Sequence, residues 1–240
     1  MVIKRVSTRG PLRALRATAR KRGAARSAGR VIAAMSDAVG VAAMPSVSRI
    51  ARQKRDPFKI LVSTVISLRT KDEVTMEASK RLFRLGSTPR GVARLPVRAI
   101  ERAIYPAGFY RNKARTIKDI ARQVADEHGG RVPDTIDGLL AFKGVGRKTA
   151  ALVVSLGYGK DAICVDTHVH RVSNRIGLVA TDTPAATENA LMGILPRKYW
   201  IGYNELLVSF GQQICTPVSP HCSTCPVTRT CERVGVGRHR

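Results

Sequence analysis

Four cysteines, placed within seventeen residues near the C-terminus, constrain this chain more than any other feature of its sequence. Cys215, Cys222, Cys225 and Cys231 follow the spacing C-x6-C-x2-C-x5-C. A structural zinc site usually combines two C-x-x-C pairs from separate elements, whereas this run holds a single C-x-x-C flanked by lone cysteines. Such a compact loop is suited to the corners of a [4Fe–4S] cluster. The spacing therefore predicts an iron–sulfur loop, with a zinc loop that recruits His221, or disulfides, as the alternatives.

The charge of the chain predicts a polyanionic partner. The 240 residues include 42 Lys and Arg against 17 Asp and Glu, a formal net charge of +25. Basic side chains that contact phosphates release condensed counterions, so this excess favours binding to nucleic acid. A basic protein that binds nucleic acid passively, without catalysis, is the alternative. No apolar run approaches the roughly 18 residues that a membrane span requires, so we expect no membrane partner.

The first 55 residues differ in composition from the rest. They hold fourteen Lys and Arg, a single acidic residue (Asp37) and no aromatic residue before Phe58. Residues 1–30 are therefore expected to form a basic, disordered arm, although the same composition is typical of an organelle transit peptide. Five cysteines without a secretory signal indicate a reducing compartment. We expect the cytoplasm or nucleoid in a prokaryote, and the nucleus or an organelle in a eukaryote.

From Asp56 onward, apolar residues recur almost without interruption at the spacing of amphipathic helices. The pattern predicts helices over 73–85 and 200–210, and Thr183 followed by proline indicates a capped helix start. No Asn-Gly or Asp-Gly hairpin signals are present. The sequence therefore predicts an all-α protein with about nine or ten helices joined by short turns.

Residues 139–158 predict two helices joined by a tight hairpin, Lys143-Gly144-Val145-Gly146. Glycine permits a turn too tight for a side chain, and the second helix then begins with free N–H groups that suit a phosphate. Arg147 and Lys148 follow directly. An ordinary turn between helices is the alternative.

Lys148 and Asp166 are the candidate chemical groups. Asp166 stands eighteen residues after Lys148, at the N-cap position of a helix expected over 167–176. A lysine amine can attack an electrophilic sugar carbon, and a nearby carboxylate can accept its proton or stabilise an oxocarbenium-like centre. The alternatives are a phosphate contact for Lys148 and a plain helix cap for Asp166.

The hairpin with Arg147-Lys148-Thr149-Ala150, the segment Val165-Asp166-Thr167-His168-Val169-His170-Arg171, and the four-cysteine run occur in this order. Together they closely resemble endonuclease III, a bifunctional DNA glycosylase and abasic-site lyase of the helix-hairpin-helix glycosylase superfamily. The resemblance extends from about residue 56 to 234. It implies that Lys148 is the nucleophile and Asp166 its carboxylate partner, acting as a monomer on double-stranded DNA with damaged bases or abasic sites. The implied substrates are oxidised or ring-saturated pyrimidines, which must be flipped out of the duplex.

The resemblance also implies two helical domains on either side of a DNA-binding groove. A six-helix barrel is expected over residues 50–160, with the helix-hairpin-helix at about 139–158. An iron–sulfur cluster domain is expected from residues 31–49 together with 161–234, followed by a tail over 235–240.

The predicted DNA contacts fall on three segments of the chain. Arg69 stands where the family has a glutamine that fills the gap left by the flipped base, and Phe109 has the flat, apolar shape of a wedge between bases. A core aromatic is the alternative for Phe109. The remaining predicted contacts with DNA come from the hairpin and the segment after it: Lys143, Gly144, Val145, Gly146, Arg147 and His168. In place of the family's leucine-proline before the hairpin glycines, the chain has Phe142 and Lys143.

Two other functions stay open. The first is a monofunctional mismatch glycosylase of the same fold, although such enzymes typically lack a lysine at the position of Lys148. The second is a non-catalytic DNA-binding iron–sulfur protein, for which the charge and the cysteine loop would suffice.

Overall fold

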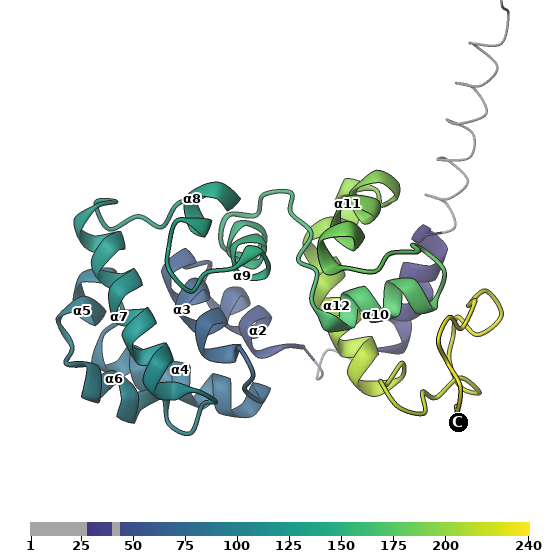
Figure 1. The fold of residues 1–240 in the computed structure, drawn as a ribbon, viewed down its shortest axis with the longest axis horizontal. Coiled ribbons are helices and arrows are strands. Elements are labelled where there is room, and N and C mark those ends of the chain that lie inside the picture. Colours follow the sequence, from purple (N-terminus) through teal and green to yellow (C-terminus); the bar gives the residue numbers. More distant parts are fainter. Residues whose placement is uncertain (1–27, 40–43) are drawn as a thin grey trace, which may run out of the picture.

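A computed structural model describes residues 28–39 and 44–240 of the chain (Figure 1). The described residues form helices, turns and loops and include no strand, which confirms the all-α prediction. The arm expected at residues 1–30 lies outside the described ranges except for residues 28–30, which are the first described part of a helix that continues to residue 38. Among the helices of the described ranges, none is both long and apolar enough to cross a bilayer.

The elements after that first helix follow one another with short connections. They are α2 (Ser46–Gln53), α3 (Pro57–Ser67), α4 (Asp72–Leu85), α5 (Pro89–Arg94), α6 (Val97–Ile104), α7 (Tyr110–Asp126), α8 (Ile136–Leu140), α9 (Arg147–Leu152), the π-helix η2 (Val153–Gly157), α10 (Thr167–Arg175), α11 (Pro184–Ile194), the 3-10 helix η3 (Arg197–Tyr199) and α12 (Trp200–Gln213).

The helices pack into two lobes that lie side by side (Figure 1). The first lobe holds α2 to α9 and η2 around one hydrophobic cluster, in which Ile60, Leu82 and Ile117 are fully buried. The second lobe packs the helix at 28–38 with α10, α11 and α12 around a separate cluster. Val47 of α2 belongs to the first cluster, although residues 31–49 were expected in the second domain. The domain boundaries themselves stay predictions.

Capping side chains fix where several helices begin. The Asp56 carboxylate accepts from the N–H groups of Phe58 and Lys59, both at 3.1 Å, at the start of α3. Thr183 accepts from Ala186 N–H at 3.2 Å, so the predicted cap before Pro184 is confirmed. Each cap satisfies backbone donors that the first turn of a helix leaves free.

Two differences from the predicted helices concern short segments. The second hairpin helix, expected to continue to residue 158, is α-helical only to Leu152 and then widens into η2. A single wide turn does not change the periodicity of apolar residues enough to be predicted from sequence. Gly157, at the end of η2, lies so close to α3 that a Cβ there would stand 3.2 Å from Pro57 Cα. Short helices such as α5 and α8 also raise the number of helices above the nine or ten expected.

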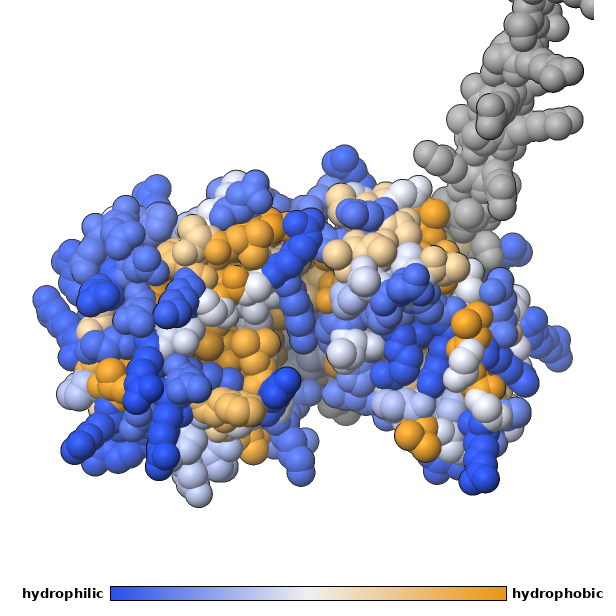
Figure 2. Space-filling view, in the orientation of Figure 1, coloured by the Kyte–Doolittle hydropathy of each residue, from blue (hydrophilic) through white to orange (hydrophobic). Residues whose placement is uncertain are grey.

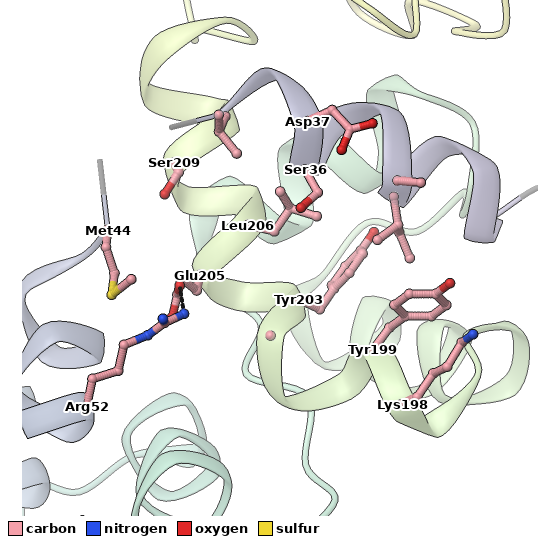
Figure 3. A pocket seen from close by; sticks show the side chains of 14 residues that line it. Ser36, Asp37, Met44, Arg52, Lys198, Tyr199, Tyr203, Glu205, Leu206 and Ser209 are labelled. Atoms are coloured by element: carbon pink, nitrogen blue, oxygen red, sulfur yellow. Dashed lines mark hydrogen bonds and ion pairs between the residues drawn. The ribbon is translucent and has the colours of Figure 1, made fainter. Parts of the chain in front are cut away.

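The two lobes are joined on one side by an ion pair. Arg52 of α2 donates to Glu205 of α12 at 3.0 Å, beside a cavity lined by the helix at 28–38, α2, η3 and α12 (Figure 3). The side chains of Tyr199 and Tyr203 lie on the same side of the second lobe. This contact is distinct from the one at the candidate active site, described next.

Candidate active site and nucleic-acid interface

The predicted hairpin lies between α8 and α9 and packs against α7. Phe142 and Val145 are buried, and Val145 N–H donates to the Phe142 carbonyl at 3.1 Å, which closes the turn. Gly144 has φ +87°, and a Cβ there would stand 2.8 Å from Thr116 of α7. Only glycine meets both conditions, so the sequence fixes a tight, exposed turn immediately before α9.

The structure brings Lys148 and Asp166 together. Lys148 lies in the first turn of α9, and Asp166 is the N-cap of α10, where its Oδ1 accepts from Val169 N–H at 2.9 Å. Its other oxygen, Oδ2, lies 3.7 Å from Lys148 Nζ, which is an ion-pair separation rather than a hydrogen bond. The lysine side chain is 44% exposed and the aspartate side chain 9%. An accessible amine therefore stands beside a carboxylate that its cap contact holds in place.

A cavity of about 490 Å³ opens over this pair. It is lined by α9, by the segment that enters α10, and by the start of α11, so both lobes contribute to it. Lys148, Asp166, Pro184 and Glu188 all face this cavity. An amine and a carboxylate therefore face one cavity that both lobes line, and such a pair is able to supply a nucleophile and a proton acceptor.

Glu188 was not among the residues predicted from the sequence. Its carboxylate accepts two hydrogen bonds from Arg147, from Nε at 2.7 Å and from Nη2 at 2.8 Å, and its side chain is 7% exposed. The bond with Glu188 raises the pKa of the Arg147 guanidinium. This pair connects α9 with α11 across the lobes. Arg147 therefore has a partner within the protein, and its predicted contact with DNA stays a prediction.

His168 and Cys164 lie on the protein side of the site. His168 Nδ1 is 3.4 Å from Arg171 Nη2, and the ring packs so closely on α12 that a Cβ at Gly211 would lie 2.7 Å from Nδ1. Burial lowers the pKa of His168, and the nearby Asp166 carboxylate opposes that shift. The buried thiol of Cys164 donates to the Lys148 carbonyl at 3.5 Å, and burial raises its pKa to about 12.

Arg69 and Phe109 lie on two neighbouring loops of the first lobe. Both have a left-handed backbone, with φ 51° and 57°, and the Arg69 guanidinium carbon lies 5.6 Å from the centre of the Phe109 ring. Phe109 is 60% exposed, so it is no core aromatic. The sequence predicts that Arg69 fills the gap left by a flipped base and that Phe109 wedges between bases, and the structure brings the two side chains together at the surface. Contact with DNA stays a prediction for both.

The four cysteines of the C-terminal run line one small cavity together with Arg175, His221, Arg233 and apolar side chains. None of the described cysteines forms a disulfide. Arg175 Nη1 donates to Cys215 Sγ at 3.7 Å, and Cys231 Sγ donates to the Arg175 carbonyl at 3.5 Å. Within the described ranges, no group of three or more His, Cys, Asp or Glu side chains is closed tightly enough to hold a single metal ion. The donor set itself, four thiols around one cavity, is the set that an iron–sulfur cluster requires.

Comparisons with known proteins agree with this geometry. Residues 62–197 match the family model of the HhH-GPD superfamily base excision DNA repair proteins. The chain is 46% identical over 180 residues to endonuclease III of Thermotoga maritima, covering 75% of this chain and 84% of that protein. It is 41% identical to the chloroplastic endonuclease III homolog 2 of Arabidopsis thaliana, of which it spans 48%.

Solved structures give the same result for the fold. A trapped covalent intermediate of endonuclease III with DNA superposes with a TM-score of 0.71 and 38% identity, covering 75% of this chain and 85% of that one. A thermostable thymine-DNA glycosylase superposes with a TM-score of 0.74 at 26% identity, covering 90% of this chain and 98% of that one.

Proposed function

Because the chain belongs to the HhH-GPD superfamily of base excision DNA repair proteins, and within it to the endonuclease III family, we propose that Lys148 is its catalytic nucleophile. The family membership makes the chain a DNA N-glycosylase with abasic-site lyase activity that acts on damaged DNA. The observation that supports the assignment of Lys148 is its position, with Nζ 3.7 Å from the Asp166 carboxylate in a cavity open to both lobes.

The proposed reaction begins with a damaged pyrimidine that is flipped out of the duplex into this cavity. Lys148 Nζ bonds to C1′ of the deoxyribose while the bond from C1′ to the base nitrogen breaks, and the base leaves with that electron pair and takes up a proton. The Asp166 carboxylate accepts the proton that Nζ gives up. Opening of the sugar ring converts the adduct to a Schiff base.

Strand cleavage then follows from the Schiff base. Its iminium group acidifies the hydrogen on C2′. A water molecule takes that proton, the electrons of the C–H bond form a double bond between C2′ and C3′, and the bond between C3′ and its phosphate oxygen breaks by β-elimination. The 3′ phosphate leaves with the bonding electrons, and hydrolysis of the remaining imine releases Lys148. The free amine returns at each turnover, and water is the only other nucleophile that these steps require.

The proposed DNA contacts use surfaces on either side of the cavity. The hairpin at Gly144–Gly146 presents free N–H groups of the first turn of α9 to a phosphate, and exposed Lys143 adds a positive charge beside it. Arg69 and Phe109 extend from the first lobe and would occupy the space that the flipped nucleotide leaves. The charge of the chain favours all of these contacts.

We also propose that Cys215, Cys222, Cys225 and Cys231 hold a [4Fe–4S] cluster. The family is expected to carry one, and these thiols line a common cavity in the second lobe. The cluster would tie a loop with few apolar residues to α10, and the proposed reaction needs no electron from it. Iron analysis should give about four irons per chain, whereas one zinc without iron would contradict the assignment.

A mismatch-specific glycosylase is the second candidate function, because the chain superposes well on a thymine-DNA glycosylase. The two activities differ in product. A bifunctional enzyme acting on a duplex with one thymine glycol should yield a nicked strand, whereas a monofunctional enzyme acting on a G·T mismatch leaves an intact abasic strand. We expect nicking of the thymine-glycol duplex and little release of thymine from the mismatch. The reverse result would assign the chain to the second function.

A further inference from the structure

Lys113 is a buried lysine of α7 that none of the sequence motifs includes. Its ammonium donates to the Ile66 carbonyl at 2.7 Å, to the Leu68 carbonyl, and to Thr70 Oγ1 at 2.8 Å. These three acceptors lie at the end of α3 and in the turn after it. Arg69 lies between these acceptors in the sequence. The ammonium of Lys113 therefore fixes the conformation of the turn that carries Arg69.

The loop that carries Phe109 is attached to the same turn. Gly108 N–H donates to Thr70 Oγ1 at 3.1 Å, so the Thr70 hydroxyl links Lys113 to the second loop. The two backbones approach so closely that a Cβ at Gly108 would lie 2.4 Å from the Arg69 carbonyl oxygen. The Arg69 and Phe109 loops thus form one unit built on Lys113.

This unit holds two residues in a backbone conformation that their side chains disfavour. Arg69 and Phe109 both have positive φ without being glycine, and such residues persist only where their surroundings impose the conformation. Phe109 also precedes α7 without a side-chain cap for that helix. The bonds from Lys113 and Thr70 are among the contacts that hold the two loops in this conformation.

We propose that Lys113 is a positioning residue, which holds the Arg69 and Phe109 loops in the shape that enters the duplex when the damaged base is flipped out. This inference rests on the proposed function and adds to it a residue that would not touch DNA. Burial lowers the pKa of Lys113 to about 8, so at neutral pH most molecules keep the ammonium that supplies all three bonds.

The position of Lys113 on α7 relates the two loops to the hairpin. Thr116 follows Lys113 by one turn, and it is the residue against which Gly144 packs. One face of α7 therefore supports the loops that would fill the gap and, one turn further, the hairpin that would hold the phosphate. If the two loops shifted relative to the hairpin, Arg69 and Phe109 would enter the duplex at a place that no longer matches the position of Lys148.

The test compares two substrates, only one of which requires Arg69 and Phe109 to enter a duplex. A duplex with one thymine glycol requires the gap to be filled, whereas a single-stranded oligonucleotide with one abasic site has no opposite base and no gap. Lys113→Met should slow single-turnover excision from the duplex about tenfold or more, because small displacements of positioning groups have large kinetic effects. Borohydride trapping on the single strand should change less than about twofold.

Lys118→Met is the matched control. Lys118 also lies on α7 and its ammonium also caps two carbonyls, of Ala93 at 3.0 Å and Leu95 at 2.6 Å, but it holds a loop outside this unit. In this variant, the ratio of the rate of excision from the duplex to the rate of trapping on the single strand should stay at the wild-type value. An unchanged ratio in Lys113→Met, or an equal change in Lys118→Met, would overturn the proposal.

Thr70→Val supplies a second variant if Lys113→Met folds poorly. It removes the hydroxyl that links the two loops while keeping the shape of the side chain, and we expect the same selective loss on the duplex. Equal rates for Thr70→Val and wild type on both substrates would contradict the inference. A wild-type protein that gives no trapped product on either substrate would instead contradict the proposed function.

Discussion

Asp166 combines two tasks in one carboxylate. One oxygen caps α10 through Val169 N–H, and the other faces Lys148. Asparagine caps helices about as well as aspartate, so Asp166→Asn removes the charge and keeps the cap. We predict that excision slows by about 10²- to 10⁴-fold, the range for loss of a positioned general base, while the melting temperature changes little. Single-turnover rates and thermal unfolding measure the two effects.

Asp56→Asn is the control for that prediction. Asp56 caps α3 with the same type of side chain, accepting from Phe58 and Lys59 N–H, but it lies outside the candidate site. Its substitution should leave excision within about twofold of wild type. Equal slowing by the two substitutions would mean that Asp166 serves only as a cap.

The residues of the candidate site differ in how readily they can be identified from the sequence alone. Lys148 and Asp166 were predictable because each follows a local signal, a glycine hairpin and a helix cap, and because their motifs match a known family. Glu188 and Lys113 carry no such signal. Each is bonded to a partner more than forty positions away in sequence, Glu188 to Arg147 and Lys113 to the turn at 66–70. Helical periodicity predicts on which face of a helix these residues lie, but it does not predict which other element packs against that face.

At the scale of helices, the Arg147–Glu188 pair joins α9 of the first lobe to α11 of the second beside the candidate site. The Arg147–Glu188 pair has an almost buried carboxylate and two hydrogen bonds. We predict that Glu188→Gln lowers the free energy of unfolding by about 1–2 kcal/mol, since one charge-assisted bond is lost while the half-exposed Arg147 regains water. It should also slow trapping on DNA, because α9 carries Lys148. Denaturant unfolding and trapping kinetics measure these changes.

Glu205→Gln provides the comparison for the other inter-lobe pair. Arg52 is 66% exposed and Glu205 22%, so this pair should contribute only about 0–1 kcal/mol. It lies away from Lys148, beside the cavity of Figure 3, and its loss should not affect trapping. Identical effects of the two substitutions on trapping would contradict a special role for the α9–α11 contact.

The helices themselves were largely predictable, for local reasons. Thr183 marks a helix start through a side chain that bonds to the next turn, and this start was predicted from the sequence. Asp56 caps α3 in the same way, although that cap was not predicted from the sequence. The wide turn of η2 was not predictable, because it depends on packing of Gly157 against Pro57 of α3. Contacts between distant helices decide such local departures.

At the scale of the whole molecule, two hydrophobic clusters divide the described residues into two lobes, with the candidate site where the lobes meet. The sequence predicted helices and a basic surface, and Figure 2 shows hydrophilic residues over much of both lobes on one face. The resemblance implied that residues 31–49 join the second domain, and the helix at 28–38 does pack with α10 and α12, whereas Val47 of α2 belongs to the first cluster. This division of the segment required the structure, because apolar residues mark a buried face without identifying its partner.

Borohydride trapping shows whether Lys148 forms the covalent bond to DNA. The protein is incubated with a duplex that holds one abasic site, reduced with borohydride, digested, and mapped by mass spectrometry. We predict one cross-linked peptide, modified at Lys148, and no cross-link in Lys148→Ala, whereas Lys143→Ala of the same hairpin still cross-links. DNA affinity of Lys148→Ala should stay within about tenfold of wild type, since one charge is a small part of the binding. Mapping of the cross-link to another residue, or undiminished trapping in Lys148→Ala, would contradict the account.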